Sequence, residues 1–178
     1  IYGVTFMVIA PEHPLTQNSM LKNVDEVNAY KAEASRKSSI ERSANKDKTG
    51  VRLDGITAIN PITKKEIPIY ISDYVMMDYG TGAIMAVPAH DDRDYQFAKK
   101  FGIPIIQVIE GGDISESAYT GDGVHINSGN LDNLGVKEAI SVMVDTLENM
   151  KCGHKMINYK MQDWPFNRQR YWGEPFPI

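Results

Sequence analysis

Residues 83–102 predict a strand, a polar loop and a helix in immediate succession. The strand, 83–87, is an unbroken apolar run that Pro88 ends. The helix, 92–101, begins with acidic residues, carries two lysines in its last turn and stops at Gly102, so its charges complement the helix dipole at both ends. Such a junction offers unpaired N–H groups beside positioned acids, and binding or catalytic sites are often built there.

Shorter apolar runs and two amphipathic patterns supply the remaining elements. We expect strands at 2–10, 56–59, 67–71 and 103–109, helices at 24–36 and 136–150, a reversal at 60–63, and loops at 38–50 and 113–129. The apolar stripe of the 136–150 helix is expected to be core. Strands outnumber helices but are mixed with them, so the fold class is α/β (mixed α+β), with a small barrel-like sheet surrounded by helices.

The 178 residues fit one ordinary domain with an appendage. We place the main domain at 1–158 and a separate segment at 159–178, because tryptophan, proline and arginine crowd into those last residues. Arg168, Arg170 and the aromatic residues that follow suit nucleotide contact or docking to another domain. Since both ends interrupt apolar or extended segments, we expect the chain to belong to a longer protein.

Composition excludes several classes of protein. The net charge of −4 gives no positive excess for a long stretch of nucleic-acid backbone, although a local contact remains open. Cys152 is the only cysteine, so no internal disulfide and no paired-cysteine metal site can form. No apolar run approaches the roughly 20 residues that a membrane span needs. We expect a cytoplasmic chain that holds no metal.

The predicted helix 92–101 carries one acidic residue on its apolar face. Asp94 shares a face with Phe97, Ala98 and Phe101 by i+3 and i+4 spacing, so it should point toward the core. Burial of an unpaired charge is costly, and Asp94 therefore needs a partner. That partner could be an arginine of the protein or a ligand cation such as an ammonium group.

A purely structural interpretation of the same loop stays open. Asp91 or Asp92 could simply cap the helix, Asp94 could complement its dipole, and Arg93 or Arg52 could neutralise Asp94. The glycines at 80 and 82 lack the lysine of a phosphate-binding loop, and no serine or cysteine stands in a nucleophile motif. Neither phosphate transfer nor covalent catalysis is indicated.

The stretch 80–95, Gly-Thr-Gly-Ala-Ile-Met-Ala-Val-Pro-Ala-His-Asp-Asp-Arg-Asp-Tyr, closely resembles the editing domain of bacterial-type leucyl-tRNA synthetases. Residues 2–14 and 58–68 are also similar to that domain, and 163–173 resembles the return to the synthetase's nucleotide-binding core. Isoleucyl and valyl enzymes share the Gly-Thr-Gly and His-Asp pattern, but the Met-Ala-Val-Pro variant and the Arg-Gln-Arg-Tyr-Trp-Gly tail favour the leucyl family. The editing domain of those related enzymes is the alternative.

The resemblance implies an editing domain of a class I aminoacyl-tRNA synthetase, which hydrolyses the ester between a wrong amino acid and the 3′-terminal adenosine of tRNA(Leu). In this family the aspartate that matches Asp94 binds the α-ammonium group of the substrate. The other matched positions line the amino-acid pocket or shape the site and hold the adenosine: Tyr79, Met85 and Val87 for the pocket, and His90 and Asp91 for the site and the adenosine.

The resemblance implies neither cofactor nor metal for editing, since ATP and magnesium belong to the catalytic core, which this sequence does not contain. The expected partners are the 3′ end of tRNA(Leu) with its amino acid and the remaining synthetase domains, but neither DNA nor a membrane. In the family a threonine-rich segment precedes the residues that match 1–4 and lines the same site. A module that binds aminoacyl-adenosine without hydrolysing it is therefore the second hypothesis.

Overall fold

The computed structural model describes residues 1–38, 41–42, 48–77 and 80–157. The chain divides into two compact units, 1–143 and 144–178, which are described separately. The predicted segment 159–178, with its arginines and tryptophans, lies outside the described residues, as does Tyr79. The sheet and the candidate site belong to the first unit.

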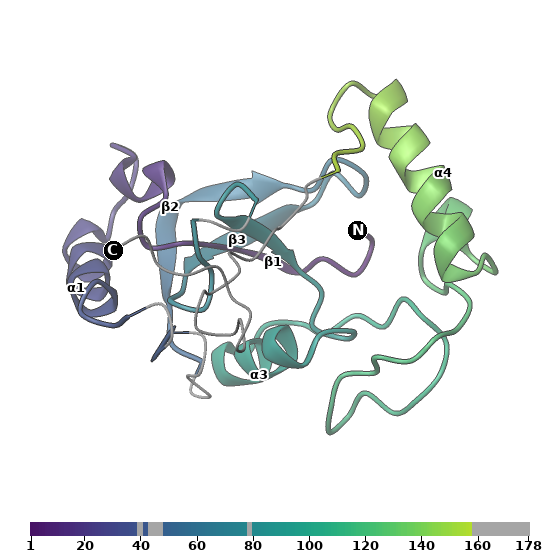
Figure 1. The fold of residues 1–178 in the computed structure, drawn as a ribbon, viewed down its shortest axis with the longest axis horizontal. Coiled ribbons are helices and arrows are strands. Elements are labelled where there is room, and N and C mark those ends of the chain that lie inside the picture. Colours follow the sequence, from purple (N-terminus) through teal and green to yellow (C-terminus); the bar gives the residue numbers. More distant parts are fainter. Residues whose placement is uncertain (39–40, 43–47, 78–79, 158–178) are drawn as a thin grey trace, which may run out of the picture. The chain divides into compact units, whose positions relative to one another are not determined.

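The first unit is built on a mixed sheet of four strands: β1 (Phe6–Ile9), β2 (Val51–Ile59), β3 (Glu66–Ile71) and β4 (Ala83–Ala86). Their order is β2-β3-β1-β4, with β1 parallel to β3 and antiparallel to β4 (Figure 1). β2 and β3 form the antiparallel hairpin predicted from the reversal at 60–63. The α/β prediction is therefore confirmed.

The predicted barrel-like closure is wrong. Within the described residues β2 and β4 are the two edges of the sheet, which stays open. The run 103–109, predicted as a strand, forms only an isolated bridge between Ile109 and His125. Closure would require the edge strands β2 and β4 to pair with each other, directly or through further strands, and the sheet order shows no such pairing among the described residues.

Alternate residues of β1 divide the core between two faces of the sheet. Phe6 and Val8 belong to a cluster with Phe97 and Ala98 of α3 (Asp92–Phe101). Ile9 belongs to the opposite cluster, with side chains of α1 (Val24–Ala34). Because neighbouring residues of a strand point to opposite sides, α1 and α3 cover opposite faces.

Other described helices are η1 (Pro14–Gln17), η2 (Gly129–Leu131) and α4 (Val136–Asn149), whose residues fall in both units. The predicted helix at 136–150 is confirmed, but its stripe is not core: of its residues only Ala139 is buried, and Ile140 is 59% exposed. An amphipathic pattern shows that a helix has an apolar face, but it does not show that another part of the protein covers that face. None of the described helices is long and apolar enough to cross a membrane.

Candidate functional site

The loop 87–91 joins β4 to α3, and Asp91 sets where the helix begins. The Asp91 carboxylate accepts hydrogen bonds from the backbone N–H groups of Arg93, at 2.8 Å, and Asp94, at 3.1 Å. This is an N-cap, so the capping role considered for Asp91 is confirmed. Gly102 closes the helix in the left-handed region, at φ 65°. Both ends of α3 are thus fixed by local sequence.

Asp94 lies in the first turn of α3 and retains only 6% of its exposure, as its place on the apolar face predicted. One carboxylate oxygen, Oδ2, accepts from the backbone N–H of Val87 at 3.0 Å. The other, Oδ1, accepts from the hydroxyl of Tyr74 at 3.2 Å. The last residue before Pro88 and a side chain from the loop after β3 therefore fix the carboxylate from two directions.

Both of these donors are neutral, and the two arginines considered as partners of Asp94 form their ion pairs elsewhere. Arg93 pairs instead with Asp91 at 3.7 Å, and Arg52 pairs with Asp54 at 3.5 Å. Neither arginine thus has Asp94 as its ion-pair partner, although the positive charge of Arg93 acts to lower the pKa of Asp94. A buried carboxylate served by two neutral donors still favours an additional positive partner.

Burial is the main influence on the ionisation of Asp94. Desolvation, followed by the negative charge of Asp91, raises the pKa of Asp94 to about 6, against the opposing effects of the Val87 N–H, the Tyr74 hydroxyl and Arg93. At neutral pH the group is still mainly charged. An approaching cation would lower its pKa again, because the cation favours the charged form.

Tyr74 serves as a hydrogen-bond donor. Burial, and next the negative charge of Asp94, raise the pKa of the Tyr74 hydroxyl above its usual range, so it keeps its proton. Its ring packs edge-on against Phe97, with centroids 6.0 Å apart, and the Lys48 ammonium lies 5.6 Å from the ring centroid. Sequence reasoning missed Tyr74, since no spacing rule connects it with a helix twenty positions later.

His90 uses both ring nitrogens within the protein. Nε2 accepts from the backbone N–H groups of Val108 and Ile109, both at 3.1 Å, so Nδ1 carries the proton and donates to the carbonyl of Tyr119 at 2.8 Å. The backbone of Tyr119 also donates to Ala89 at 2.8 Å. The imidazole therefore ties the segments around 108 and 119 to the β4–α3 loop and is not free to act as a base.

The pocket positions implied by the resemblance are only partly brought together. Val87 is half-buried and contributes its backbone to Asp94, whereas Met85 is 56% exposed on β4. Tyr79 is outside the described residues, so its position beside Met85 stays a prediction.

A metal would need ligands that the described residues do not assemble. Among them, no three side chains of the His, Cys, Asp or Glu types gather closely enough to hold an ion. What the described residues do offer is a buried carboxylate held by two hydrogen bonds, which suits a ligand with a positive group.

The comparisons with known proteins agree with this geometry. The model of the family described as "Leucyl-tRNA synthetase, editing domain" matches residues 1–148. A leucyl-tRNA synthetase of Agrobacterium radiobacter, solved in a ternary complex with tRNA and LeuAMS, is similar in structure, with a TM-score of 0.65 and 31% sequence identity. The match covers 92% of this chain and 17% of that synthetase, so the chain spans about a sixth of its relative. The chain belongs to the leucyl-tRNA synthetase editing-domain family.

Proposed function

We propose that this chain hydrolyses aminoacyl-tRNA(Leu) that carries the wrong amino acid, as the editing domain of a leucyl-tRNA synthetase. The observation that carries the proposal is the buried Asp94 carboxylate, which two neutral donors, the Val87 N–H and the Tyr74 hydroxyl, fix in place. The α-ammonium group of an esterified amino acid supplies the positive charge that such a carboxylate favours. A free carboxylic acid or an uncharged ester would lack it.

The need for a second, hydrolytic site follows from binding energies. A pocket sized for leucine rejects a near-isosteric side chain by only about 1–3 kcal/mol, or roughly 10–200-fold. Accurate translation requires discrimination nearer about 10⁴-fold. Hydrolysis of the wrongly formed ester supplies the remainder.

In the proposed reaction Asp94 holds the ammonium group and so places the ester carbonyl. A water molecule adds to the carbonyl carbon, the bond to the ribose oxygen breaks, that oxygen gains a proton, and the amino acid leaves. Polar groups and the free hydroxyl of the adenosine stabilise the developing oxyanion. Asp94 binds and orients; no covalent intermediate on the protein is required.

The other residues implied by the family surround this position. Met85, Val87 and Tyr79 would line the amino-acid pocket, where bulk excludes leucine. Asp91 and His90 would shape the adenosine side, His90 through the backbone segments that it ties to the loop. The body of the tRNA, ATP and magnesium would belong to other domains of a cytoplasmic synthetase, in line with the net charge of −4.

The test is deacylation of isoleucyl- or norvalyl-tRNA(Leu) by the protein in its full natural length. Asp94→Ala should let mischarged tRNA accumulate. Asp92→Ala is the matched control, because it removes the same charge from an exposed position in the same helical turn. Unchanged deacylation by Asp94→Ala would reject the proposal. Binding of a non-hydrolysable aminoacyl-adenosine without any turnover would favour the binding-module hypothesis instead.

A further inference from the structure

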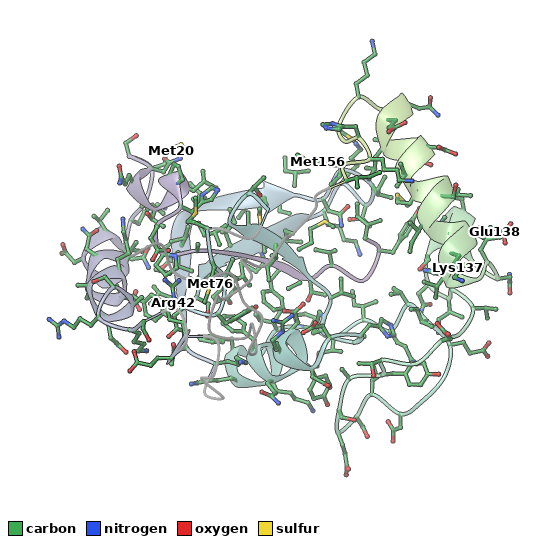
Figure 2. All side chains as sticks on the ribbon, viewed as in Figure 1. Met20, Arg42, Met76, Lys137, Glu138 and Met156 are labelled. Carbon is green, nitrogen blue, oxygen red and sulfur yellow. The ribbon has the colours of Figure 1, made fainter. Side chains whose placement is uncertain are left out.

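Arg42 binds the backbone on both sides of Tyr74. Its Nε donates to the carbonyl of Asp73 at 2.8 Å, and its Nη2 donates to the carbonyl of Val75 at 3.0 Å. Figure 2 labels Arg42 and Met76, the residue that follows Val75. The third nitrogen, Nη1, pairs with Glu12 at 2.8 Å. A planar guanidinium that bonds both flanking carbonyls fixes the two peptide planes, and with them the direction of the Tyr74 side chain.

This corrects the expectation that residues 38–50 form only an exposed loop. Arg42 is 9% exposed, and its two bonds to backbone carbonyls are among buried atoms. Composition could not show this, because an arginine in a polar stretch usually lies in solvent. Here the bonds to the 72–76 turn outweigh the loss of hydration.

Further contacts hold the same turn. The backbone N–H of Asp73 donates to the Tyr30 hydroxyl at 3.0 Å, and the Asp73 carboxylate pairs with Lys37 at 2.9 Å. The Ser72 backbone donates to Ile9 of β1 at 3.1 Å. Tyr74 therefore extends from an anchored turn toward Asp94, and its ring rests on Phe97, three residues beyond Asp94 in α3.

We propose that the Tyr74 hydroxyl is a positioning group for the Asp94 carboxylate, and that Arg42 holds Tyr74 in place for an ammonium-bearing substrate. The inference rests on the proposed function. With Oδ1 fixed by Tyr74 and Oδ2 by Val87, the carboxylate cannot rotate, and each oxygen keeps a lone pair for the ammonium group. Without the Tyr74 hydroxyl, Oδ1 of Asp94 loses its donor, and the charged form of the Asp94 carboxyl group is less favoured.

The expected pH effect follows from every group that faces the carboxylate. Asp91 opposes ionisation of Asp94, whereas Arg93, the Val87 N–H and the Tyr74 hydroxyl support it. Lys48 lies over the ring of Tyr74 from the preceding segment and is unchanged by removal of the hydroxyl. Tyr74→Phe therefore raises the pKa of Asp94, and the acidic limb of the deacylation profile moves to higher pH.

The experiment compares Tyr74→Phe with Tyr95→Phe in the full-length protein. Tyr95 is the neighbour of Asp94 in α3, but its hydroxyl donates to the carbonyls of Ile114 and Ser115, so Tyr95→Phe is the matched control. Titration of the Asp94 carboxyl carbon by NMR should move to higher pH in Tyr74→Phe alone. The KM for deacylation should rise about 3–10-fold, the value of one hydrogen bond, with less change in kcat.

An Asp94 titration that Tyr74→Phe leaves unchanged would overturn the inference, whatever the deacylation rates. An inactive Asp94→Ala beside a Tyr74→Phe of normal KM would also overturn it while leaving the proposed function intact. Conversely, an active Asp94→Ala rejects the proposed function itself. For the second part, Arg42→Lys should move the titration in the same direction as Tyr74→Phe and should add nothing in the double variant. If the shifts of the Asp94 titration in the two single variants add up in the double variant, Arg42 does not act through Tyr74.

Discussion

Two buried aspartates in the first unit differ in what accompanies them. Asp73 is 2% exposed, and its carboxylate pairs with Lys37 at 2.9 Å. Asp94 is 6% exposed, and the donors to its carboxylate among the described residues are a backbone N–H and a phenolic hydroxyl. The two carboxylates are similarly buried, but a cation pairs with Asp73, whereas neutral donors bind Asp94. Asp73 therefore serves the fold, and Asp94 is suited to bind a ligand. For a buried carboxylate, neutral donors in place of a cation, rather than burial itself, indicate a binding site.

The largest expected effect separates the two aspartates by activity. Asp94→Ala should slow deacylation of mischarged tRNA by about 100-fold or more, the kinetic equivalent of losing about 3 kcal/mol of charge pairing. Asp73→Ala should instead lower the free energy of unfolding by about 2–3 kcal/mol, because Lys37 and the Thr49 hydroxyl lose the carboxylate that they bind. Deacylation kinetics and urea unfolding, measured for both variants, test these two expectations. If Asp94→Ala and Asp73→Ala change the deacylation rate and the free energy of unfolding alike, the two aspartates do not have different roles.

The second prediction concerns stability against pH without substrate. Since the pKa of Asp94 rises from 3.8 to about 6 on folding, its ionisation opposes folding above about pH 4 and has its full effect above pH 6. Asp94→Asn should therefore increase the free energy of unfolding by about 1–3 kcal/mol at pH 8 and change it little below pH 4. Urea titrations at both values measure this. A variant that loses stability at pH 8 would show that Asp94 is already compensated.

The third prediction separates the charge of Asp91 from its cap. Asp91→Asn retains an N-cap acceptor but removes the negative charge, so the pKa of Asp94 should fall with little change in stability. Asp91→Ala should produce the same fall and in addition lose about 1 kcal/mol of stability. Carboxyl NMR and thermal unfolding together test this. An unaltered Asp94 titration in both variants would mean that Asp91 does not contribute.

The smallest effect is expected at Arg93. Its side chain is 67% exposed and pairs with Asp91, so Arg93→Gln should change stability by less than about 0.5 kcal/mol. The pKa of Asp94 should rise, but by less than in Tyr74→Phe, because the hydroxyl touches the carboxylate directly. If the pKa of Asp94 rises more in Arg93→Gln than in Tyr74→Phe, Arg93 is the counter-ion of Asp94. Asp94 would then be paired with a cation, as Asp73 is.

Local signals predicted the best-defined parts of the fold. The acids, lysines and glycine around α3 fixed its ends, and i+3 spacing placed Asp94 on its buried face. The same reasoning failed for 103–109, where an apolar run does not reveal whether a strand edge is available for pairing. The stripe of α4 failed for a related reason, since amphipathicity does not identify the surface that covers it.

The contacts that define the site were harder to predict. Tyr74 reaches Asp94 across twenty positions, and Arg42 reaches Asp73 across 31 positions. Such pairs depend on how the chain folds across the sheet, in which β1 separates β3 from β4, and no periodicity encodes that arrangement. The family resemblance named Asp94 and its neighbours, but it gave no reason to look at Tyr74 or Arg42.

The pairing of β1 with β4 has a consequence for length changes. Phe6 stands opposite Ala86 and Met7 opposite Met85, so a deletion of one residue in β4 would exchange inward and outward side chains. It would also move the Val87 amide away from Asp94. Insertions and deletions at 83–91 should therefore be poorly tolerated, whereas the connection 113–129 can change length only away from Ile114, Ser115 and Tyr119, which bind α3 and the β4–α3 loop.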